Sequence, residues 1–140
     1  MSRSGPLVIV EDDRDDRDFL EKVFLDLKVD NERLWFENAD EALRHLKTTA
    51  LSTFMIICDI NLPGLNGIDF KKTIDADPYL RKKSIPFLYY STAATPKTVN
   101  EAYAAVSVQG FFKKSSSYEE GKIMFSAIFA YWKLCRHPNT

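Results

Sequence analysis

Short apolar runs alternate with amphipathic stretches along almost the whole chain, and this alternation constrains the fold more than any other feature. The runs are rich in β-branched or aromatic residues and are closed by polar or turn-forming residues, which is typical of buried strands. The predicted strands cover residues 7–10, 34–36, 54–58, 87–90 and 110–112. The stretches that separate or follow them repeat apolar residues at helical spacing, and we expect helices over residues 15–28, 39–48, 67–75, 96–106 and 118–135.

This order of elements predicts the fold class. Strands that alternate with helices form a parallel sheet covered on both faces. Right-handed crossovers leave few topologies, and the flavodoxin-like strand order 2-1-3-4-5 places the first and third strands side by side. We therefore predict an α/β fold with a doubly wound (βα)5 parallel sheet. It forms a single domain over residues 1–140 with its core at about 7–135. We expect residues 75–84 to form a solvated loop and the tail 137–140 to fray.

The composition excludes several classes of function. Hydrophobic residues make up 45% and charged residues 28% of the chain, and the net charge is -1. This balance favours neither nucleic acid nor an anionic membrane as a partner. No apolar stretch approaches the ~20 residues that cross a bilayer, and the residues before Leu7 lack the apolar run of a signal peptide. With only Cys58 and Cys135, we expect a cytoplasmic protein in which Cys58 is an inert core thiol.

Acidic residues stand where two of the predicted strands end. Asp59 follows the run 54–58, and Glu11 and Asp12 follow the run 7–10. Because these strands are predicted neighbours, their carboxyl ends meet at one edge of the sheet, where such folds bind ligands. Clustered carboxylates are costly there unless a cation neutralises them, and Mg²⁺ prefers oxygen ligands. We expect a divalent cation at this edge and chemistry on Asp59.

The fourth and fifth predicted strands bring polar residues to the same edge. Ser91 and Thr92 follow the fourth predicted strand, and Lys113 and Lys114 follow the fifth. A carboxylate can attack phosphorus and form an aspartyl phosphate. The oxygens of a phosphoryl group are then matched by a cation, a hydroxyl, a lysine and backbone amides. The residue types at this edge therefore suit phosphoryl transfer to Asp59.

Four motifs, taken together and in this order, resemble the receiver domain of two-component response regulators. They are VEDD at residues 10–13, CDINLPGLNG at 58–67, YSTA at 90–93 and GFFKK at 110–114, and the resemblance extends from about residue 7 to 134. It implies a CheY-like, stand-alone response regulator that accepts a phosphoryl group from a sensor histidine kinase or a phosphotransfer protein. Apart from its own phosphorylation and dephosphorylation, such a protein is not an enzyme.

The resemblance also implies a metal site and an output surface. Asp59 matches the phosphoacceptor, and the Mg²⁺ ligands beside it match Asp12, its acidic neighbour Glu11 and the backbone carbonyl of Asn61. The surface that would switch and bind an unknown downstream protein is formed by the helix 96–106, the strand 110–112 and the helix 118–135.

The phosphoryl-binding residues follow from the same match. Ser91 matches the switch hydroxyl, the backbone amide of Thr92 a phosphoryl donor, Lys114 the active-site lysine and Phe111 the aromatic switch residue. The family commonly has proline, often after a cis bond, where this chain has Ser115. A cis bond before a non-proline residue costs about 2.5–4 kcal/mol, so we expect a trans bond and a looser loop after Lys114.

Two other functions remain open. A phosphohydrolase with an aspartyl-phosphate intermediate would share this chemistry, but such enzymes typically have a second aspartate where this chain has Asn61. A degenerate receiver would bind its partner without phosphorylation. The helix 118–135 is apolar on more than one face, which indicates either a wide buried face or an exposed surface for a partner or a homodimer.

Other titratable residues have simpler interpretations. Asp15, Asp16 and Asp18 lie near the start of a predicted helix, where its dipole favours acidic side chains. We expect no function for His45 or His137, because neither belongs to a metal-binding spacing.

Overall fold

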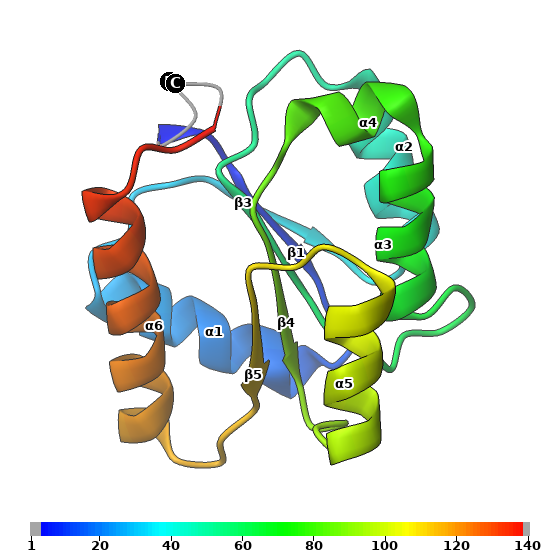
Figure 1. Cartoon of the computed structure of the whole chain (residues 1–140). Coiled ribbons are helices and arrows are strands. Elements are labelled where there is room, and N and C mark those ends of the chain that lie inside the picture. The colour runs from blue at the N-terminus through cyan, green and yellow to red at the C-terminus, as the bar shows by residue number, and fades with distance from the viewer. Residues whose placement is uncertain (1–3, 139–140) are drawn as a thin grey trace.

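Five parallel strands form one sheet in the order β2-β1-β3-β4-β5 in the computed structural model, which describes residues 4–138. The predicted α/β class and strand order are confirmed (Figure 1). The described elements are β1 (Leu7–Val10), α1 (Arg14–Asp26), β2 (Arg33–Phe36), α2 (Ala39–Thr48), β3 (Met55–Cys58), α3 (Gly67–Ala76), α4 (Pro78–Lys83), β4 (Phe87–Ser91), α5 (Pro96–Ala105), β5 (Gly110–Lys113) and α6 (Tyr118–Leu134).

Helices cover both faces of the sheet (Figure 1). Alternate residues of a strand point to opposite faces. Accordingly, Val8 and Val10 of β1 pack into the core beneath α2, α3 and α5, whereas Leu7 and Ile9 pack into the core beneath α1 and α6. Every residue of β1 and β3 is buried, which explains why their apolar runs are continuous rather than alternating. Among residues 4–138, no helix is long and apolar enough to cross a membrane.

Capping residues set where the helices begin. Each of the five longer helices follows a polar residue whose side chain accepts a hydrogen bond from a backbone amide of the first turn. These residues are Asp13, Asn38, Asn66, Thr95 and Ser117. The caps place the start of each helix close to the carboxyl end of the preceding strand, and therefore near the edge of the sheet predicted to carry the site.

The prediction of a solvated loop over residues 75–84 is wrong, because α4 occupies most of this segment. The side chain of Asp77 accepts hydrogen bonds from two amides of its first turn, and Pro78 occupies the first helical position. Leu80, which is 2% exposed, anchors the short helix in the core shared with α2 and α3.

The prediction that the tail frays is wrong for His137, which is 3% exposed. Its ring packs against Phe54 and Trp132, and its Nε2 is in hydrogen-bond contact with the carbonyl of Phe54. His137 therefore has a structural role where the chain leaves α6. Asn139 and Thr140 lie outside the described residues.

Gly67 holds the loop that follows β3 against the sheet. Its amide donates to the carbonyl of Ile60 at 2.8 Å, and its own carbonyl accepts from the hydroxyl of Tyr89 at 2.8 Å. A Cβ on Gly67 would lie 2.3 Å from the carbonyl oxygen of Asp59. This close approach is possible only for glycine, and it fixes the backbone that carries Asp59.

Candidate functional site

Asp59 lies at the carboxyl end of β3 and is only 7% exposed. Its amide donates to the carbonyl of Val10 at 3.0 Å, which continues the pairing of β1 with β3. Its Oδ1 accepts hydrogen bonds from the amide of Ile60 at 2.7 Å, the amide of Asn61 at 3.3 Å and the hydroxyl of Ser91 at 2.6 Å. These donors hold the carboxylate in one orientation.

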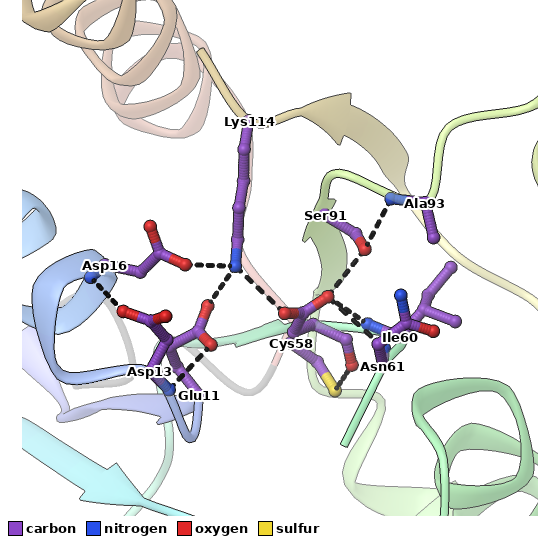
Figure 2. Close-up of polar contacts among 10 residues, drawn as sticks. Glu11, Asp13, Asp16, Cys58, Ile60, Asn61, Ser91, Ala93 and Lys114 are labelled. Atoms are coloured by element: carbon purple, nitrogen blue, oxygen red, sulfur yellow. Dashed lines mark hydrogen bonds and ion pairs between the residues drawn. The ribbon is translucent and has the colours of Figure 1, made fainter. Parts of the chain in front are cut away.

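Lys114 binds the other oxygen of this carboxylate. Its Nζ lies 2.9 Å from Oδ2 of Asp59, 2.6 Å from Oε1 of Glu11 and 2.7 Å from Oδ2 of Asp16. Figure 2 shows the Lys114 side chain extending from the end of β5, with Asp16 and Glu11 on one side of its nitrogen and Ser91 on the other. The side chain is 7% exposed, so the three contacts form in an environment largely shielded from water.

The backbone around Lys114 is well anchored. Its amide donates to the carbonyl of Ser91 at 3.0 Å, which extends the pairing of β4 with β5. No peptide bond within residues 4–138 is cis, so the predicted trans bond before Ser115 is confirmed. The predicted looseness is not seen at Lys114, because three carboxylates and a backbone hydrogen bond hold it.

The charges in the site depend on one another. Burial alone would lower the pKa of Lys114, but its contacts with Asp16, Glu11 and Asp59 outweigh this effect and raise it. The ammonium group therefore stays protonated. Burial raises the pKa of Glu11, and Lys114 opposes that shift. Burial also raises the pKa of the Cys58 thiol, as expected for the predicted inert core thiol.

Three carboxylates in this pocket fit a divalent cation. Glu11, Asp12 and Asp59 each offer an oxygen, and these atoms lie within 4.8 Å of one another. Glu11 and Asp59 are buried, whereas Asp12 is exposed. A set of carboxylate oxygens with room for water or phosphate oxygens suits Mg²⁺.

The structure brings together most of the site residues named from the sequence, namely Glu11, Asp12, Asp59, Ser91 and Lys114. Asn61 and Thr92 are exposed beside them, and the roles of their backbone groups stay predictions. Phe111 is half-buried in β5, and its ring centroid lies 5.8 Å from that of Tyr89. Its role as a switch also stays a prediction.

Asp16 belongs to the site as well, although from the sequence we expect only an acidic residue favoured by the dipole at a helix start. It lies in the first turn of α1, where its amide donates to the capping Asp13 at 3.0 Å. Its side chain nevertheless reaches Lys114, which is 98 positions away in the chain. No local pattern could reveal this contact, because it depends on how α1 and β5 meet.

Comparison with known families agrees with this geometry. The model of the response regulator receiver domain matches residues 7–125. The chain belongs to this family. It is thus a receiver domain of two-component response regulators, with a signalling role. Receiver domains interact with histidine kinases or phosphotransfer proteins and bind Mg²⁺ in their acidic site.

Individual relatives point the same way. The chemotaxis protein CheY-3 of Vibrio cholerae is 30% identical over 115 residues, which cover 81% of this chain and 83% of that protein. The phosphorylated cyanobacterial phytochrome response regulator RcpA is 21% identical, with a TM-score of 0.81 over 98% of this chain and 99% of that one. The receiver domain of the Pseudomonas aeruginosa sensor histidine kinase PA1611, solved with magnesium in its active site cleft, is 18% identical, with a TM-score of 0.70 over 91% and 95%. These two structures share the fold of this receiver.

Proposed function

We propose that Asp59 accepts a phosphoryl group from a sensor histidine kinase or a phosphotransfer protein in the cytoplasm, in a reaction that requires Mg²⁺. The observation that carries this proposal is the pairing of a buried carboxylate with a hydroxyl on one oxygen and an ammonium group on the other. Ser91 and Lys114 supply these groups at 2.6 Å and 2.9 Å. Both are suited to bind phosphoryl oxygens once the group is attached.

The Mg²⁺ ion would be held by Glu11, Asp12 and Asp59, together with the backbone carbonyl of Asn61. The three carboxylates support this assignment because their oxygens lie within 4.8 Å of one another. When bound, Mg²⁺ supplies positive charge that offsets the carboxylates and the phosphoryl oxygens. The PA1611 receiver domain, which was solved with magnesium in its active site cleft, supports the choice of metal.

In the transfer step, a carboxylate oxygen of Asp59 forms a bond to phosphorus while the phosphorus–nitrogen bond of the donor phosphohistidine breaks. The electron pair of that bond leaves with the imidazole nitrogen. Oδ1 accepts hydrogen bonds from the Ser91 hydroxyl and the Asn61 amide. The same two groups would donate hydrogen bonds to the phosphoryl oxygens. Lys114 on the opposite side would stabilise the charge of the transferred group.

Phosphorylation would then change the surface formed by α5, β5 and α6. Ser91 currently donates to Asp59 and accepts a hydrogen bond from the amide of Ala93, in the segment that leads to α5. The amide of Phe111 in β5 donates to the hydroxyl of Tyr103 in α5 at 3.0 Å, so these two elements are linked. A phosphoryl group that draws Ser91 and Phe111 inward would shift the population of this surface toward a second arrangement, which a downstream protein binds.

We also infer that α6 binds a protein. This helix has both a wide buried face and an exposed apolar face. One face is buried, while Ile123, Tyr131 and Leu134 on the outside are 69%, 61% and 89% exposed. Large apolar side chains gathered on one exposed face favour a protein contact.

Phosphorylation can be tested by measuring the intact mass of the protein after incubation with a small phosphodonor, with and without Mg²⁺. We expect a single phosphoryl adduct that forms only with Mg²⁺. A folded, Mg²⁺-binding protein that gains no adduct would instead favour the interaction module that works without phosphorylation. Sustained turnover of a generic phosphate ester would favour the phosphohydrolase.

Ser91→Ala is expected to keep the adduct but lose the change in the output surface. The hydroxyl is completely buried and is the group that links Asp59 to the segment before α5. Hydrogen exchange of the α5 and β5 amides, compared before and after phosphorylation, measures this coupling. Ser91→Thr keeps the hydroxyl and should respond like the wild type. An unchanged response in Ser91→Ala would show that the switch does not pass through this residue.

A further inference from the structure

Lys114 contacts three carboxylates, and two of them also belong to the proposed cation site. Its Nζ lies 2.6 Å from Oε1 of Glu11 and 2.9 Å from Oδ2 of Asp59. Both residues are members of the cluster of carboxylates that could hold a metal ion. An ammonium group and a divalent cation are both attracted to carboxylate oxygens. Lys114 therefore competes with the cation for Glu11 and Asp59.

Both oxygens of each of these two carboxylates already accept hydrogen bonds. Oε2 of Glu11 accepts from the amide of Asp13 at 3.2 Å, and Oδ1 of Asp59 accepts from the hydroxyl of Ser91 and from two backbone amides. The side chains of Glu11 and Asp59 are only 3% and 8% exposed, so two positive charges placed between them would repel each other with little screening by water. A cation can bind both residues only if Lys114 gives up part of its contact with them.

Asp16 is the third partner of Lys114, and its Oδ2 lies 2.7 Å from the lysine Nζ. Within the part of the chain that the structure describes, the carboxylates close enough to share a cation are those of Glu11, Asp12 and Asp59, and Asp16 is not one of them. Its side chain is 37% exposed, so water reaches this carboxylate more readily than the buried ones. Contact with Asp16 therefore keeps Lys114 beside the cluster without using an oxygen of the cation site.

The backbone of Asp16, rather than its side chain, supports the start of α1. Asp16 is the third residue of this helix, where a carboxylate can accept a hydrogen bond from the amide of the capping residue. Here the amide of the capping Asp13 donates to Glu11 instead. The amide of Asp16 donates to Asp13 at 3.0 Å, while its carboxylate contacts Lys114. Replacing the Asp16 carboxylate should therefore leave the helix start intact.

We propose that Asp16 is a positioning residue that keeps Lys114 beside Asp59 while Glu11 and Asp59 bind the cation. This inference rests on the Mg²⁺ site of the proposed function, and it adds a residue that acts on that site through Lys114. The long, flexible lysine stem lets the ammonium group turn toward Asp16 while the backbone stays bonded to the carbonyl of Ser91. The present contacts show that one ammonium group can reach Asp16 and Asp59 together.

Isothermal titration calorimetry of the full chain with Mg²⁺ tests this role. Asp16→Asn keeps the shape of the side chain and removes its charge, so Lys114 should stay on Glu11 and Asp59 and oppose the ion. We expect the dissociation constant for Mg²⁺ to rise about tenfold, which corresponds to the loss of one hydrogen bond between charged groups. Asp16→Glu retains a carboxylate that can bind the ammonium group, and its dissociation constant should stay within about twofold of the wild-type value.

Asp15→Asn is the matched control, because Asp15 is exposed in the same turn of α1 and its replacement makes the same change of charge. Salt screens an exposed charge, so at physiological ionic strength the dissociation constant should change by less than about twofold. Equal weakening in Asp15→Asn and Asp16→Asn would show that Asp16 adds only to the general negative field, and would overturn this inference alone. A wild type that binds no Mg²⁺ would overturn the metal site of the proposed function and this inference with it.

The same substitutions in a Lys114→Met background show whether Asp16 acts through the lysine. Without Lys114, Asp16→Asn should change the affinity for Mg²⁺ no more than Asp15→Asn does. The effects of two residues that act through one contact are not additive, and this comparison measures their coupling. If Asp16→Asn still weakens binding about tenfold in the absence of the lysine, Asp16 acts on the ion directly, and the positioning role is wrong.

Discussion

Asp59→Asn is expected to abolish the Mg²⁺-dependent phosphoryl adduct completely. The amide that replaces the carboxylate is not a competent nucleophile toward phosphorus, and the site loses one of its three clustered carboxylates. The variant should still fold, because the retained carbonyl oxygen can accept the hydrogen bonds that Ile60 and Asn61 donate to the carboxylate. Intact mass after incubation with the phosphodonor measures the effect directly.

Asp40→Asn serves as the control for Asp59→Asn. Asp40 is exposed in the first turn of α2 and is not one of the three clustered carboxylates, and its replacement makes the same chemical change. It should be phosphorylated like the wild type. If Asp59→Asn gains an adduct as the wild type does, the acceptor is another residue. Sensitivity of that adduct to hydroxylamine would then separate an acyl phosphate from a phosphorylated hydroxyl.

Lys114→Met is expected to lower the free energy of unfolding by about 3 kcal/mol in the absence of Mg²⁺, because removing one member of a buried charge cluster leaves the others unpaired. The side chains of Glu11 and Asp59 are 3% and 8% exposed, and both lose an ammonium group within 2.9 Å. Urea unfolding measures the change. Lys113→Met, at the exposed neighbouring position, should change stability by less than about 0.5 kcal/mol.

Magnesium and pH should both modify the effect of Lys114→Met. With the competing ammonium group gone, the carboxylates should bind Mg²⁺ more tightly, so the ion should restore much of the lost stability. Burial raises the pKa of Glu11, and the loss of Lys114 raises it further. The stability of the variant should therefore recover as the pH falls through this raised pKa and decline as the pH rises. Equal stability loss in Lys113→Met, or weaker Mg²⁺ binding in Lys114→Met, would contradict this account.

Several features of the fold could be predicted from local sequence patterns. The runs 7–10 and 54–58 are apolar because β1 and β3 are buried on both faces. Such runs are visible without knowing what packs on them, and alternation with helices then leaves few topologies. The helix α4 could also have been predicted, since Asp77 followed by Pro78 is a typical helix start. The Asp-Pro pair is stronger evidence for a helix than the polar composition of residues 75–84 is for a loop.

The clustering of the acidic residues could be predicted for a related reason. In a parallel sheet, the residues that follow neighbouring strands must lie at one edge, so the positions of Glu11, Asp12 and Asp59 in the sequence imply their proximity. Ser91 and Lys114 come at the carboxyl ends of β4 and β5, and for the same reason they lie beside Asp59. Topology alone determines this clustering, and it does not require knowledge of any side-chain conformation.

The sequence by itself thus determined the class of fold, the order of the strands and the residue types that meet at one edge of the sheet. Only the tertiary structure decided that Asp16 shares Lys114 with Glu11 and Asp59, and that His137 closes the end of α6 against Phe54. The physical reason is the range of the interactions. Strand and helix patterns arise from neighbours a few positions apart, whereas these contacts join residues 98 and 83 positions apart and exist only once the helices have packed on the sheet.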